Sequence, residues 1–98
     1  MALYAATVTL GAAAQSLDPA AVIPKPIVSL RIESDTGNAA VYVGKDNTVS
    51  ATVYGASILA GPAAALNIGY GDNGKFNLQD VWVTGTNGNK IRLLAVTQ

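Results

Sequence analysis

The carboxylates of Glu33 and Asp35 form the closest acidic pair in the sequence that could do acid–base chemistry. Hydrolysis of a glycosidic bond needs an acid and a base whose carboxyl groups lie about 5 to 10 Å apart. These two residues stand where an alternating segment runs into the turn residues 35–38, and carboxylates in such places are normally solvated. We therefore expect both on the surface and predict no catalytic role for them.

Other common catalytic groups are missing from the sequence. It contains no histidine and no cysteine, so the commonest general base, the thiolate nucleophile and the usual zinc ligands are absent. Asp46, Asp72 and Asp80 could bind calcium, for which oxygen ligands suffice, but they lack the dense acidic spacing of calcium loops. We expect no enzyme activity, no metal and no cofactor.

The glycine-rich segment 69–74 fits the spacing G-x-G-x-x-G. That spacing can bring backbone amides against a dinucleotide pyrophosphate at the start of a helix. The residues that follow, 76–84, have a strand-like sequence and supply no helix dipole. A loop between two strands is therefore the prediction for this segment.

Five aromatic side chains could stack on the apolar faces of sugars: Tyr4, Tyr42, Tyr54, Tyr70 and Trp82. Most aromatic residues in strands fill a core or an interface. Trp82 stands between Val81 and Val83, so a strand here places its ring on the face opposite the two valines. We predict a core or subunit contact for Trp82 and keep a sugar platform as the alternative.

Short strands are the elements that must position these residues. Period-two alternation and flanking turn residues indicate strands near residues 4–10, 27–33, 40–44, 49–54, 64–68, 81–84 and 90–97. Three prolines, Pro19, Pro24 and Pro26, prevent a long helix between the first two strands. The pair Asn87-Gly88 predicts a two-residue hairpin turn.

The two most regular segments show which side chains should face the core. In residues 27–33 the apolar set is expected inward and the polar set outward: Val28, Leu30 and Ile32 against Ser29, Arg31 and Glu33. In residues 90–97 both faces are apolar near the end, where Leu94 and Val96 alternate with Ala95. That pattern indicates a sandwich interior or a subunit contact.

These elements predict an all-β fold of seven to eight short antiparallel strands in a single-domain, jelly-roll-like β-sandwich. A chain of 98 residues has room for one domain and one core. We expect residues 1–26 to form an N-terminal strand or arm and a proline-containing connection. Residues 27–98 should form the main sandwich.

The composition points to surfaces that are hidden by neighbours. Half of the residues are hydrophobic and only 12% are charged, against about 25% charged residues in ordinary soluble domains. A small domain has much surface for its volume, so apolar residues must lie outside as well as inside. An assembly subunit is therefore favoured over a monomer with a polar surface.

Charge and hydropathy also bear on the kind of partner. Six basic and six acidic residues cancel and are scattered, so we do not expect nucleic acid as a partner. No apolar run approaches the ~20 residues of a membrane span, and no basic leader region opens the chain. We expect a soluble, unprocessed chain without a membrane partner.

From about Ser29 onward the sequence resembles a widespread kind of small tailed-phage virion protein. The matching run includes Val41-Tyr42-Val43-Gly44, residues 49–52 and 58–61, Val81-Trp82-Val83-Thr84 within 77–86, and the final strand at 90–94. The resemblance implies a capsid decoration or cement protein, or a component of tails and fibres. It also implies a jelly-roll-like sandwich and a homotrimer on the outer capsid surface, bound to the major capsid protein and made in the bacterial host cytoplasm.

The alternative function is a tail- or fibre-associated module that binds a receptor or glycan through Trp82, Tyr70 or Tyr54. For the decoration protein, seven side chains are predicted to lie in protein–protein contacts: Leu3, Tyr4, Val8, Tyr42, Trp82, Leu94 and Val96.

Overall fold

The computed structural model describes residues 2–19, 26–35, 39–58, 65–69 and 76–97. Along the chain, its elements are β1 (Ala2–Thr9), β2 (Gln15–Ser16), β3 (Ile27–Ser34), β4 (Val41–Gly44), β5 (Ala56–Ile58), β6 (Ala65–Gly69), the single 3-10 turn η1 (Leu78–Asp80), β7 (Trp82–Thr84) and β8 (Lys90–Thr97). None of the described residues lies in an α-helix. The prediction of an all-β chain with seven to eight antiparallel strands is confirmed.

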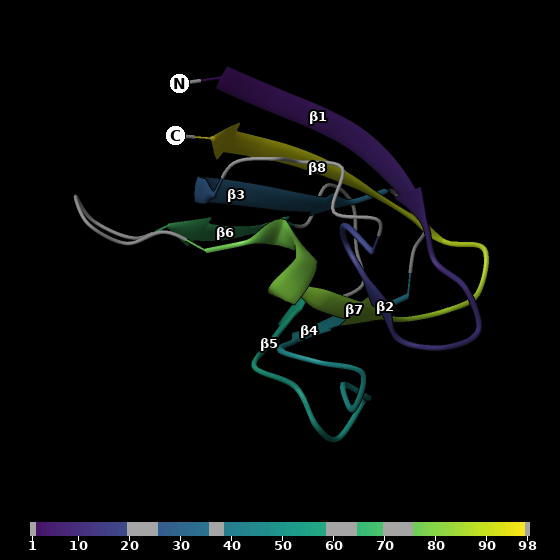
Figure 1. Cartoon of the computed structure of the whole chain (residues 1–98). Helices are drawn as coiled ribbons and strands as arrows, with labels where there is room; N and C mark the ends of the chain where they lie inside the picture. The colour runs from purple at the N-terminus through teal and green to yellow at the C-terminus, as the bar shows by residue number, and fades with distance from the viewer. Residues whose placement is uncertain (1, 20–25, 36–38, 59–64, 70–75, 98) are drawn as a thin grey trace.

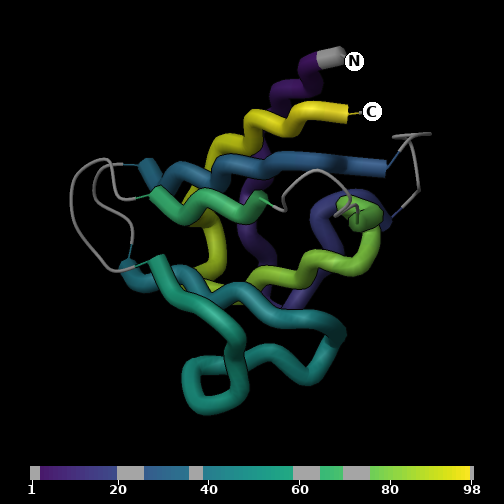
Figure 2. Tube along the Cα trace, turned by 90° about the vertical axis from the view of Figure 1, so that its left-hand side faces the viewer, coloured from purple at the N-terminus to yellow at the C-terminus, as the bar shows by residue number. Residues whose placement is uncertain are grey.

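The strands form two antiparallel four-stranded sheets, ordered β1-β8-β3-β6 and β2-β7-β4-β5. Figures 1 and 2 show the sheets lying one above the other. The first strand pairs with the eighth, the second with the seventh, the third with the sixth and the fourth with the fifth. The pairing therefore follows the pattern of one long antiparallel hairpin with its turn between β4 and β5. The strands of this hairpin are divided between the two sheets.

The core lies between the inner faces of the two sheets. Strand β8 alternates strictly through Ala95, with Ile91, Leu93 and Ala95 buried and the residues between them exposed. From the facing sheet, Val41 and Val83 are fully buried. This alternation is the period-two pattern of strands that carry the core on one face.

The prediction for one core residue is wrong. Val28 is only partly buried, whereas its neighbour Ile27 is completely buried. The pairing of β3 with β8 shifts between Ile27 and Ser29, so β3 carries an extra residue there. Such a bulge reverses the alternation of faces, which turns Ile27 inward; Leu30 and Ile32 are buried as predicted.

The prediction of a strand at residues 49–54 is also wrong. These residues form a loop, and β5 begins only at Ala56. The Ser50 hydroxyl accepts hydrogen bonds from the backbone N–H groups of Thr52 at 3.2 Å and Val53 at 3.1 Å. Serine bonds of this local kind compete with a strand ladder, which explains why the alternation of residues 49–54 gives no strand.

The turn at Asn87-Gly88 is present, but it does not make a hairpin. The N–H of Asn89 donates to the carbonyl of Thr86 at 3.1 Å, and Gly88 has a φ of 92° that favours glycine. However, β7 lies in one sheet and β8 in the other. The turn therefore carries the chain between the two sheets.

Candidate functional site

A group of apolar side chains lies on the outer face of β1 and β8, where Leu3, Ala5 and Leu94 are exposed and Val96 is half-buried. The register places Leu3 opposite Val96 and Ala5 opposite Leu94. Leu3 is 71% exposed and Leu94 is 44% exposed, the first and fourth in exposure among the large exposed hydrophobic residues of the described part. We call Leu3, Ala5, Leu94 and Val96 the apolar strip.

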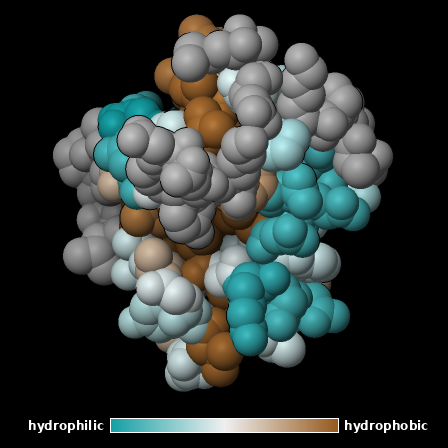
Figure 3. Space-filling view, turned by 60° about the vertical axis from the view of Figure 1, so that its left-hand side comes forward, coloured by the Kyte–Doolittle hydropathy of each residue, from teal (hydrophilic) through white to brown (hydrophobic). Residues whose placement is uncertain are grey.

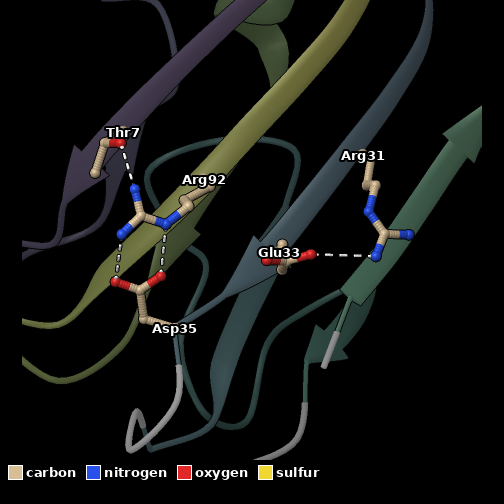
Figure 4. Close-up of polar contacts among 5 residues, drawn as sticks. All are labelled: Thr7, Arg31, Glu33, Asp35 and Arg92. Atoms are coloured by element: carbon tan, nitrogen blue, oxygen red, sulfur yellow. Dashed lines mark hydrogen bonds and ion pairs between the residues drawn. The ribbon is translucent and has the colours of Figure 1, made fainter. Parts of the chain in front are cut away.

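The other half of the same face is polar. Arg92 on β8 lies between Thr7 of β1 and Asp35 at the end of β3 (Figure 4). Its Nε donates to Asp35 Oδ1 at 2.9 Å, its Nη2 to Oδ2 at 3.2 Å and its Nη1 to Thr7 Oγ1 at 3.0 Å. The forked guanidinium thus ties β1, β8 and the end of β3 together beside the apolar strip.

The acidic pair from the sequence lies at this polar end. Glu33 and Asp35 are on the surface as expected, with side-chain exposures of 39% and 28%. Each carboxylate binds an arginine: Asp35 binds Arg92, and Glu33 accepts a bond from Arg31 Nη2 at 3.2 Å (Figure 4). Both carboxylates therefore form ion pairs with arginines on the outer face of the sheet.

The seven predicted contact residues fall into three groups. Leu3, Leu94 and Val96 come together in the apolar strip. Tyr4 and Val8 alternate with them on β1, face inward and pack against the core cluster. Tyr42 and Trp82 are half-buried on the outer face of the second sheet. Sequence alternation placed each residue on a face, but only the long-range pairing of β1 with β8 assembles the strip.

The aromatic residues of the second sheet form a smaller group. Trp82 lies opposite Gly44, and Tyr42 lies opposite Thr84, so the two rings occupy diagonal positions on one face. The ring of Tyr42 also packs on Tyr54 with centroids 5.0 Å apart and planes tilted by 49°. Tyr54 is 49% exposed, whereas Tyr70 lies outside the described residues.

A cavity of about 550 Å³ opens between the sheets beside β5 and β6. Its lining is mainly apolar and includes Val49, Val53, Tyr54, Leu66, Ile68 and Phe76. Figure 3 shows hydrophobic residues along the middle of one face of the molecule and hydrophilic residues mainly to their right. No local sequence pattern predicts the cavity, because its lining comes from several separate segments.

Of the three calcium candidates, only Asp46 and Asp80 lie among the described residues. The Asp46 carboxylate accepts bonds from the Thr48 hydroxyl at 2.5 Å and the Thr48 N–H at 2.9 Å, and these bonds lower its pKa below the usual 3.8. Asp80 lies on η1, and Asp72 lies outside the described residues. No group of three or more histidine, cysteine, aspartate or glutamate side chains that could hold a metal occurs in the described part.

The glycine-rich segment can be followed only at its first residue. Gly69 ends β6, and the loop predicted for the rest of residues 69–74 lies outside the described residues. The residues after it carry η1 and β7.

Within the described ranges, no helix is long and apolar enough to cross a membrane. Comparisons of this chain with protein families, curated proteins and solved structures find no match.

Proposed function

We propose that this chain is a capsid decoration or cement protein of a tailed phage, which stabilises the shell through protein–protein contacts. The observation that carries the proposal is the apolar strip. Contiguous exposed apolar residues on a small domain mark interaction sites, and two neighbouring strands hold Leu3 and Leu94 in a fixed relation. The resemblance of residues 41–44, 77–86 and 90–94 to tailed-phage virion proteins favours this kind of assembly.

The strand pairing supports the finer assignment of the fold as a jelly-roll β-sandwich. A jelly roll is a long antiparallel hairpin wrapped into two four-stranded sheets, and it occurs in viral capsid and lectin domains. The four pairs from β1–β8 to β4–β5 have that arrangement. Because a fold hosts many functions, the functional proposal rests on the strip.

The proposed mechanism uses both halves of the outer face. The apolar strip would form the centre of the contact with the major capsid protein, and the ion pair of Arg92 with Asp35 would lie at its polar rim. Each such contact is small. Several copies of the chain bound to one closed shell raise the effective concentration of every contact, so weak interfaces together resist the outward pressure of packaged DNA.

Addition of the purified chain to phage particles that lack it tests this proposal. Such particles come from the encoding phage after deletion of the gene for this chain. We expect the chain to bind a fixed number of sites on the outer shell and to raise the temperature at which the particles release DNA. Failure to bind, or binding without any change in heat resistance, would refute a cementing function.

A tail or fibre module that binds a glycan is the second candidate, favoured by the packed rings of Tyr42 and Tyr54 beside Trp82. Sugars stack on partly exposed aromatic rings of this kind. Binding on a glycan array that disappears in the folded Trp82→Ala variant, and persists in the Leu94→Thr variant, would favour this candidate. The reverse sensitivity in shell binding would favour the decoration protein.

A further inference from the structure

The outer edge of β1 has the properties of a strand-pairing surface. Strand β1 is eight residues long and lies at the edge of its sheet, where β8 is its one described neighbour. We propose that β1 pairs antiparallel with β1 of a second copy of this chain, across a two-fold axis. The two first sheets then become one continuous sheet with the order β6-β3-β8-β1-β1-β8-β3-β6.

The other three edge strands contrast with β1. They are β6 with five residues, β5 with three and β2 with two. Very short edges are one of the ways in which proteins prevent unwanted strand pairing, and charged residues, prolines and bulges are others. Strand β1 contains no charged residue and no proline, and its register with β8 runs without a shift. Among the described residues its edge is therefore long and regular, and a side chain bonds it only at its end, where Gln15 Nε2 donates to the Thr9 carbonyl at 3.4 Å.

A second copy of β1 fits this edge better than an unrelated strand. The two edges have the same length, and neither carries a charge that would repel the other. Both alternate in the same way, with Tyr4 and Val8 facing inward and Leu3 facing outward. A β1 pair therefore joins outer face to outer face along its whole length.

The alternation of faces and the length of β1 together favour two registers for such a pair. Outer residues lie beside outer residues only when the numbers of opposing residues add up to an even number, because a slip of one residue exchanges the faces. Two registers satisfy this condition and pair seven of the eight residues of β1. One places Ala5 opposite Ala5 of the second copy, and the other places Ala6 opposite Ala6.

The two-fold pair also brings the two apolar strips onto the same side of the joined sheet, since both registers keep Leu3 and Leu94 on its outer face.

The two-fold pair differs from the three-fold ring that the resemblance implies. The proposed dimer contact uses the backbone edge of β1, whereas the proposed shell contact uses side chains on the outer face, with Leu3 and Ala5 of β1 among them. A dimer that fails to bind phage particles would therefore refute the proposed function and leave this inference standing.

Native mass spectrometry and sedimentation of the purified chain at micromolar concentration test the inference. We expect a dimer, and we expect Ala5→Lys to convert it to a folded monomer because the substitution places ammonium groups along the joined edge. The matched control is Ala65→Lys, on the same outer face at the opposite edge of the sheet, which should remain a dimer. A monomeric or trimeric wild-type chain, or a dimer unaffected by Ala5→Lys, would overturn the inference.

Single cysteines provide a second test, since the chain has none of its own. Directly opposed residues of antiparallel strands have Cα atoms about 4.5 to 5.5 Å apart, which is within the range of a disulfide. Under mild oxidation, either Ala5→Cys or Ala6→Cys should form a covalent dimer, and the reactive one identifies the register. Ala65→Cys should stay monomeric on denaturing gels. Crosslinking of Ala65→Cys alone, or of none of the three variants, would contradict the proposed pair.

Discussion

Replacement of the two exposed leucines of the apolar strip by threonine should weaken binding to the phage shell. Threonine favours strands and is polar, so the Leu3→Thr/Leu94→Thr variant keeps the strand preference of β1 and β8 while removing apolar surface. Both side chains are exposed, at 71% and 44%. Exposed substitutions of this kind change the free energy of unfolding by only about 0.5 kcal/mol, so the variant should fold.

The size of the effect follows from the exposed fractions. Together the two side chains expose about the surface of one whole leucine, and complete burial of a leucine is worth about 1.5 to 3 kcal/mol. A contact that covers both side chains should therefore lose about 2 kcal/mol in the variant. At 1.4 kcal/mol per tenfold change, this is a loss of affinity of about 30-fold.

The assay is equilibrium binding of labelled chain to particles that lack it, measured for the wild type, the double variant and Val53→Thr. Val53 is 54% exposed but lies in the loop between β4 and β5, away from the strip, so its substitution should leave the affinity unchanged. Equal affinities of the wild type and the folded double variant would refute the assignment of the strip. Equal losses in the double variant and Val53→Thr would show a nonspecific apolar contact.

Two further predictions concern the stability of the fold. A Cβ atom added at Gly44 would lie 2.7 Å from both Cβ and Cγ2 of Val49, so Gly44→Ala should lower the free energy of unfolding by about 1 to 3 kcal/mol in urea titrations. Gly69→Ala should not lower it, because a Cβ atom there meets no atom of the described residues within 4 Å. The bonds from Thr48 lower the pKa of Asp46 below 3.8 in the folded chain, so its carboxylate stabilises the fold above that pH. The stability difference between the wild type and Asp46→Asn should shrink as the pH falls through the lowered pKa, and a difference independent of pH would contradict this role.

Local patterns in the sequence predicted the fold class and most strands. Alternation identified β1, β3, β4 and β8, because each carries the core on one face. Two errors arose where local bonds or geometry override the pattern: the bulge that turns Ile27 inward and the Ser50 hydroxyl that holds the loop before β5. The Asn87-Gly88 turn shows the same limit, since the turn residues specify a bend but not which strands pair.

The candidate site was predicted only as separate residues. Leu3 and Leu94 occupy diagonal positions on one face because β1 pairs with β8 along the whole strand, from opposite ends of the chain. No local property of either segment specifies that register. Arg92 illustrates the same point, since its guanidinium joins Thr7 to Asp35 across three segments that are distant in sequence.

Hydroxyl-radical footprinting of the free chain and of intact phage particles most directly tests whether the chain acts through the apolar strip. The side chains of Leu3 and Leu94 are exposed in the free chain, so radicals should oxidise them readily there. In the particle their oxidation should fall several-fold, while that of Val53 should stay the same. Unchanged oxidation of Leu3 and Leu94 in particles that carry the chain would contradict a contact made by the strip.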